Sequence, residues 1–225
     1  MKSIRARLTL PDSLIHPMHA FVAETPGFRR TSLLHGNPLV DDRNTFLFHV
    51  DGDDPEAYTD ALEASPSILD YEISQTDDRP GFYLAVQEGD FEADAGLSNA
   101  FLGTGVVVIS PIIFREDRSV DLSLVGTAEA LTDTFESLPP SIEADVREIH
   151  EYDGRVADPA AALSPRQRDA LVVAVELGYY GNPREASVSA VADRLDCSTG
   201  TAAEHLRKAE AAVFRRIVRD GPARW

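Results

Sequence analysis

The sequence predicts an α+β protein in two parts, an N-terminal body of alternating strands and helices and an all-α C-terminal domain. Before residue 156, apolar residues recur at every second position in several segments. After residue 162 they recur at helical spacing, behind clear capping signals. The charge changes too, because residues 1–156 carry 11 basic and 29 acidic residues whereas residues 157–225 carry 10 and 9. We therefore expect one domain at 1–156 and another at 157–225.

The first half of the body has the element order strand, helix, strand, strand, helix, strand. Its first segment alternates apolar and polar residues, which is typical of a half-buried strand. Asp54 and Pro55 supply the start signal of the second helix. The expected elements are a strand at 4–10, a helix at 14–23, strands at 29–35 and 46–50, a helix at 54–62 and a strand at 68–74.

The same order returns in the second half of the body. The expected elements are a strand at 82–86, a helix at 94–102, strands at 106–114 and 120–124, a helix at 128–137 and a strand at 142–152. Two βαββαβ units of this kind, at about 1–76 and 79–154, would be tandem ferredoxin-like modules with antiparallel sheets. On topology alone, they are comparable with paired ACT-like ligand-binding modules.

Three helices are expected in the C-terminal domain. Ser164 is a good N-cap, Pro165 fits the first helical position, and Gln167 completes a capping box. This first helix carries an apolar stripe made of Ala170, Leu171, Ala174, Val175 and Leu177. Ser187 caps a shorter second helix, and Ser198 caps a long third one. The third helix places Ala202, Leu206, Ala209, Val213 and Ile217 on its inner side.

The short helix, the turn at 196–198 and the long helix together predict a helix-turn-helix. Small or hydrogen-bonding residues at the start of the third helix suit the approach to base edges in a major groove. Basic residues on the first and third helices could reach phosphate. The candidate DNA-binding residues are Arg166, Arg168, Ser198, Thr199, Gly200, Thr201, Ala203, Glu204, Arg207 and Lys208.

Four linked runs give this domain a specific resemblance. They are LSPRQR at 163–168, ELGYY at 176–180, PREAS at 183–187 and HLRKAE at 205–210. Together they resemble the helix-turn-helix domain of haloarchaeal bacterio-opsin activator-like regulators. That resemblance implies a transcription regulator with a sensory or accessory region ahead of its DNA-binding domain. The chain departs from the expected pattern at 196–200, where Asp196 stands in a turn position often filled by glycine.

Composition indicates a halophilic source. The formal net charge is −17, and only two of the 21 basic residues are lysine. A surface rich in Asp and nearly free of Lys suits a cytoplasm of molar salt, which screens self-repulsion. No apolar run is long enough for a membrane span and the N-terminus lacks a signal-peptide pattern, so we expect a cytoplasmic protein.

Metal, cofactor and catalytic sites are not expected. The single cysteine, Cys197, excludes a disulfide framework and a cysteine-rich zinc site. His16 and His19 flank Pro17, which argues against a regular helix that presents both rings to a metal. Neither a nucleotide-binding glycine motif nor a nucleophile elbow is present, so we expect no enzyme activity.

The sequence leaves two functions open. The first is a DNA-binding transcription regulator that forms a homodimer on a palindromic site. Its body would sense a small-molecule effector, or serve in oligomerisation or in holding a protein partner. The alternative is a protein-interaction adaptor whose helical tail docks on the transcription machinery without touching DNA. Double-stranded DNA, a second copy, an effector and a transcription-machinery partner are therefore the candidate partners.

Overall fold

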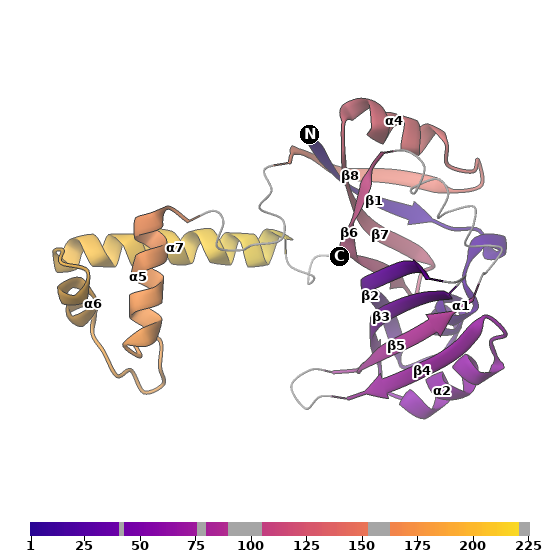
Figure 1. The fold of residues 1–225 in the computed structure, drawn as a ribbon, viewed down its shortest axis with the longest axis horizontal. Coiled ribbons are helices and arrows are strands. Elements are labelled where there is room, and N and C mark those ends of the chain that lie inside the picture. The colour runs from indigo at the N-terminus through magenta and orange to yellow at the C-terminus, as the bar shows by residue number, and fades with distance from the viewer. Residues whose placement is uncertain (41–42, 76–79, 90–104, 153–162, 221–225) are drawn as a thin grey trace. The chain divides into compact units, whose positions relative to one another are not determined.

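The computed structural model describes residues 1–40, 43–75, 80–89, 105–152 and 163–220. The chain divides into two compact units, Met1–Tyr152 and Asp153–Trp225 (Figure 1). The first unit holds the strands and the second holds three helices, so the observed class is α+β. No helix among the described residues is long and apolar enough to cross a membrane.

The strands of the first unit all belong to one antiparallel sheet. They are β1 (Lys2–Thr9), β2 (Phe28–Val40), β3 (Arg43–Gly52), β4 (Ile68–Ser74), β5 (Phe82–Glu88), β6 (Val107–Arg115), β7 (Ser119–Gly126) and β8 (Glu143–Glu151). The helical elements are η1 (Asp12–Leu14), α1 (Pro17–Glu24), α2 (Pro55–Ala64) and α4 (Ala128–Glu136). The helix expected at 94–102 lies outside the described residues.

The helices of this unit begin where the sequence supplies a cap. The amide of Ala57 donates to the Asp54 carboxylate at 3.0 Å, and the amide of Ala130 donates to the Thr127 hydroxyl at 3.1 Å. Pro17 occupies the first turn of α1, where it has no amide hydrogen to lose. The helix expected at 14–23 thus begins at Pro17, where the proline ring fits the helix start.

The sheet order is β4-β5-β3-β2-β6-β7-β1-β8, with antiparallel pairing throughout. Residues 1–76 do not form a sheet of their own, because β1 lies between β7 and β8. Conversely, β5 lies between β3 and β4. This corrects the expectation of two modules that are each built from one continuous stretch of chain. The alternation of apolar and polar residues identifies a strand, but it does not identify the strands with which that strand pairs.

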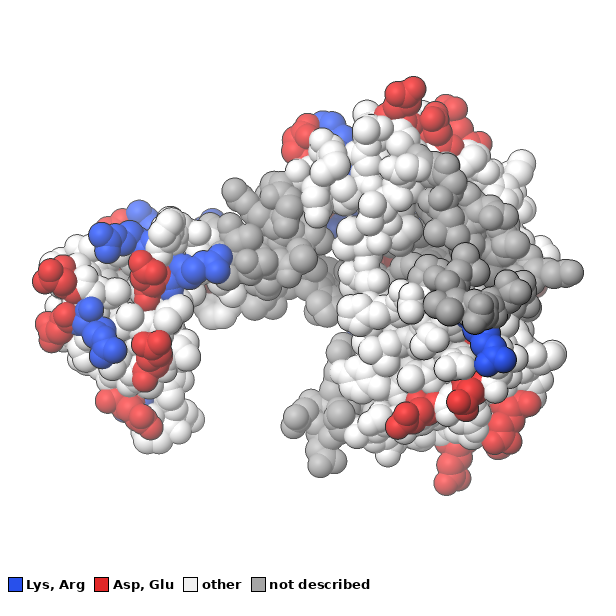
Figure 2. Space-filling view, in the orientation of Figure 1, with Lys and Arg blue, Asp and Glu red and all other residues white. Residues whose placement is uncertain are grey.

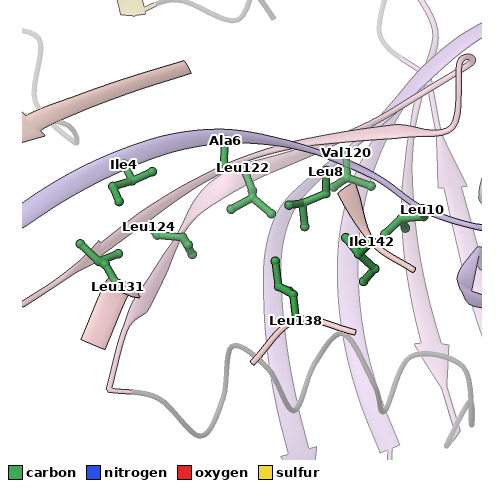
Figure 3. Packing of buried hydrophobic residues seen from close by; sticks show 10 residues of the cluster. All are labelled: Ile4, Ala6, Leu8, Leu10, Val120, Leu122, Leu124, Leu131, Leu138 and Ile142. Carbon is green, nitrogen blue, oxygen red and sulfur yellow. The ribbon is translucent and has the colours of Figure 1, made fainter. Parts of the chain in front are cut away.

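Two apolar cores lie on the sheet. The first of them explains why β1 pairs with β7. Three residues of β1 alternate inward and, with Leu10 just after the strand, pack with β7, α4 and the segment before β8 (Figure 3). This core contains Ile4, Ala6, Leu8, Leu10, Val120, Leu122, Leu124, Leu131, Leu138 and Ile142. The second core joins α1 and α2 to the strands at the other end of the sheet, and contains Met18, Val22, Phe28, Val50, Tyr58, Leu62, Phe82, Leu84 and Val86.

Candidate nucleic-acid interface

The second unit consists of α5 (Pro165–Glu176), α6 (Val188–Arg194) and α7 (Thr199–Asp220). Helix α5 begins with the predicted capping box. The amide of Gln167 donates to the Ser164 hydroxyl, and the Ser164 amide donates to the Gln167 side chain at 2.9 Å. Arg166 and Arg168 are exposed in the first turn of this helix. Both guanidinium groups are therefore held at a defined helix start.

The three helices pack through small side chains. Alanines fill most of the buried positions, so the helix backbones approach closely. The buried residues are Ala170, Ala174, Val191, Ala192, Ala202 and Leu206. Ala209 continues this inner side of α7. The stripe expected on α5 is wrong at one position, because the Val175 side chain is 66% exposed and faces away from the other helices.

The turn between α6 and α7 has the backbone geometry of a helix-turn-helix. The amide of Cys197 donates to the Ala192 carbonyl at 3.0 Å, which closes the end of α6. Asp196 has a φ of +53°, in the left-handed region that favours glycine. The departure noted in the sequence therefore leaves the turn intact, since aspartate tolerates this conformation better than most side chains.

Ser198 organises the first turn of α7. Its hydroxyl accepts a hydrogen bond from the Thr201 amide at 3.1 Å and lies 2.8 Å from the Thr201 hydroxyl. These polar atoms satisfy each other while the residues remain exposed. The start of the helix is thus both fixed and accessible.

All the predicted contact residues of α7 lie on the surface. Ser198, Thr199, Gly200, Thr201, Ala203, Glu204, Arg207 and Lys208 are exposed. The Lys208 ammonium lies 2.6 Å from the Glu204 carboxylate, one turn away, and its hydrogen bond holds the pKa of Glu204 below its usual value. Acidic and basic side chains are interspersed on the face of this unit seen in Figure 2. Charge alone therefore does not mark the interface.

A polar clamp between the α5–α6 loop and α7 escaped the sequence analysis. The Tyr180 hydroxyl donates to Glu210 Oε1 at 2.6 Å. Neighbouring Tyr179 lies beneath the Arg184 guanidinium, which is 4.7 Å from the ring centroid. The ELGYY and PREAS runs contain three of these residues. Their spacing alone does not reveal which helix they contact.

The histidines at positions 16 and 19 have structural roles. His16 caps α1 by accepting from the Met18 amide at 3.2 Å, and its other ring nitrogen lies 2.7 Å from Glu88. His19 is stacked on Phe114, with ring centroids 3.5 Å apart. No group of side chains suited to a metal ion occurs among the residues that the structure describes.

The body also contains an open cleft of about 340 Å³ where β2 pairs with β6. Three arginines and three carboxylates line it, namely Arg29, Arg30, Asp51, Arg115, Glu116 and Asp117. Arg115 also donates to the buried Asp121 at 2.6 Å, and Arg7 donates to both oxygens of the same carboxylate at 2.7 and 2.9 Å. The hydrogen bonds to Asp121 raise the pKa of Arg7. The lining is therefore polar and balanced in charge.

Two sequence families match the chain. The family described as HVO_0513, N-terminal, matches residues 16–152, and the family described as an HTH DNA binding domain matches residues 163–215. The transcriptional regulator NarO of Haloferax volcanii is 41% identical over 56 residues, which are 25% of this chain and 26% of NarO. The chain thus covers about a quarter of the length of this relative.

The family follows from these matches together with the geometry of the second unit. The N-terminal match spans more than half of the chain, and the second match spans all three helices up to residue 215. The chain belongs to the family described as HVO_0513, N-terminal, and its second unit is a helix-turn-helix domain of the bacterio-opsin activator-like type.

Proposed function

We propose that this protein is a DNA-binding transcription regulator that reads a major groove with the start of α7. One observation carries the proposal. Thr199, Gly200 and Thr201 at the start of α7 are exposed, while α5 and α6 pack against the opposite side of the same helix. A helix-turn-helix inserts its recognition helix into the major groove in this way, with the other helices packed against the side that faces away from the DNA. NarO is a transcriptional regulator by name, which agrees with this assignment.

The exposed residues divide into two groups by chemistry. Thr199, Gly200, Thr201 and Ala203 are short, so they allow the helix to come close to base edges. Arg166, Arg168, Arg207 and Lys208 carry cations on long stems and would reach phosphates on either side of the groove. Contacts to phosphate would position the domain, and contacts along α7 would supply sequence preference.

We further propose that the protein acts as a homodimer. A single recognition helix covers one half-site, and two heads about one helical turn of DNA apart would bind a palindrome. In molar salt the release of counterions contributes little to affinity. A second DNA-binding domain would therefore compensate for the low affinity of a domain whose basic and acidic side chains are interspersed.

The body is proposed to sense an effector. Its sheet order is consistent with two ferredoxin-like halves, β4-β5-β3-β2 and β6-β7-β1-β8, that have exchanged their first strands. The cleft described above lies where these halves meet, at the pairing of β2 with β6. Its arginines favour a small anionic or zwitterionic ligand.

Selection of duplex DNA from a random library tests the DNA-binding proposal. The full chain in molar potassium chloride is expected to enrich a palindromic motif, and residues 1–152 alone are expected to enrich none. Arg207→Ala should weaken binding to all selected sites and reduce the salt dependence by about one phosphate contact. Arg215→Ala, which removes an exposed arginine two turns farther along α7, is the matched control. Equal enrichment by residues 1–152 would contradict the proposal.

A protein-interaction adaptor remains the second candidate, and the Glu204–Lys208 ion pair favours it. Lys208 is the one lysine of the helical unit and is engaged by a carboxylate rather than left for phosphate. The adaptor predicts that Thr201→Ala combined with Lys208→Ala leaves promoter occupancy unchanged and abolishes capture of a protein partner. The regulator predicts loss of occupancy.

A further inference from the structure

An acidic side chain occupies the middle of the exposed face of α7. Each helical residue turns by about 100°, so Glu204 projects away from the buried side of the helix. The side chain of Glu204 is 55% exposed, whereas Leu206 is 2% exposed. The other residues of the outward face are Gly200, Ala203, Arg207 and Lys208.

The surroundings of Glu204 are unusually open. Side chains of a helix lean toward its N-terminus, so Glu204 leans over the turn that holds Gly200. A Cβ added at Gly200 would meet no atom closer than the Ser198 hydroxyl, at 3.9 Å. Ala203 adds only a methyl group beside it. Gly200 and Ala203 therefore leave the front of the helix open on the N-terminal side of Glu204.

A carboxylate in this position is costly for a DNA-binding helix unless it has a specific partner. It repels the phosphates on both sides of the groove. Lys208 offsets this repulsion at 2.6 Å and orients the carboxylate along the exposed face. Of the base-edge groups in the major groove, the N4 amino group of cytosine is the donor that Glu and Asp accept from.

We infer that Glu204 is a specificity-determining residue that accepts a hydrogen bond from cytosine N4 in the major groove. Lys208 acts as the positioning residue that holds its carboxylate. This inference rests on the proposed DNA-binding function and deepens it, because it fixes one base pair of each half-site. A purely structural ion pair on a solvated helix face would leave base preference unchanged.

Glu204→Gln tests the assignment by changing the hydrogen-bonding pattern. Glutamine pairs with adenine through N6 and N7, so one position in each half-site should change from C·G to A·T. Full-length wild-type protein and the variant are put through the same selection from a random duplex library in molar potassium chloride. The expected result is a change in preference at that position of at least tenfold, with the other positions of the motif unchanged.

Matched measurements separate the failure of this inference from the failure of the function. Glu176→Gln makes the same chemical change on the exposed last turn of α5 and should leave the motif unaltered. Circular dichroism confirms that each variant is folded. A motif that is enriched by wild type and retained unchanged by Glu204→Gln overturns the inference alone. The absence of any enriched motif with wild-type protein overturns both the inference and the proposed function.

Discussion

The Tyr180 hydroxyl donates a hydrogen bond of 2.6 Å to the Glu210 carboxylate, and so joins the α5–α6 loop to α7. Partial burial and this hydrogen bond raise the pKa of Tyr180 well above its ordinary value. The phenol therefore stays protonated, and keeps donating, at any pH the cell experiences. The contact fixes the loop against the helix that the regulator would present to DNA.

Tyr180→Phe is expected to destabilise the helical unit by about 1 kcal/mol, because a charge-assisted hydrogen bond is lost while the ring is kept. The side chain is 43% exposed, so the loss stays below that of a buried pair. Hydrogen exchange of the α7 amides in the full chain measures the effect. Tyr152→Phe lies outside the helices and is the control. Equal protection of α7 in the Tyr180 variant and in wild type would show that the contact contributes nothing.

The left-handed conformation of Asp196 predicts that two aspartate-to-glycine substitutions change the stability of the helical unit in opposite directions. Asp196→Gly should stabilise the helical unit by about 0.5–1 kcal/mol, because glycine adopts a φ of +53° without the Cβ clash. Asp193→Gly should destabilise it by a similar amount, because this residue is helical, in α6. Thermal unfolding of both variants provides the measurement. Destabilisation by Asp196→Gly would mean that the carboxylate itself stabilises the turn.

The helical unit could be predicted from sequence because its signals are local. Ser164, Gln167 and Ser187 cap their helices as their positions predict. Helical spacing of apolar and small residues placed Ala202 and Leu206 in the core. Val175 was misplaced because it lies at the border of the apolar stripe, where helical spacing does not decide whether a neighbour covers it.

In the body, local sequence patterns predict the positions of the strands but not their order in the sheet. All eight strands lie near the expected segments, since alternation is a property of each strand alone. Their order was missed because β1 and β7 pair across more than 100 residues of chain. The Tyr180–Glu210 clamp was missed for the same reason, since its partners come together only once the helices have packed.

The sheet topology predicts that neither half of the body folds alone. Fragment 1–76 lacks β5, and it would carry β1 without its neighbours β7 and β8. Fragment 79–154 lacks β1, whose Ala6 and Leu8 are completely buried in the core of β7 and α4. We expect each fragment to give an unfolded spectrum in circular dichroism and residues 1–152 to give a folded one. A mixture of the two fragments should regain the sheet. A cooperative thermal transition in fragment 1–76 alone would contradict the exchanged arrangement.

His19, a half-buried histidine of α1, predicts acid sensitivity of the body. Burial lowers the pKa of His19 well below its ordinary value, and neighbouring His16 contributes in the same direction. Its ring stacks on Phe114 and shares a 3.1 Å hydrogen bond with the Thr31 hydroxyl, and desolvation in this site disfavours the charged form. Because the unfolded chain binds a proton more readily than the folded one, this contribution is complete above about pH 6.5 and declines as the pH falls below it.

His19→Phe keeps an aromatic ring on Phe114 and removes the titrating group. The variant is expected to be less stable than wild type at pH 7.5, because the Thr31 hydroxyl loses its partner in a buried site. Its stability should fall less steeply between pH 7 and pH 5, since unfolding no longer takes up a proton at this position. Chemical denaturation of residues 1–152 at a series of pH values measures both effects. His150→Phe changes an exposed histidine on β8 and should leave the slope as in wild type. If His19→Phe and wild type lose stability in parallel on acidification, the acid sensitivity does not arise at His19.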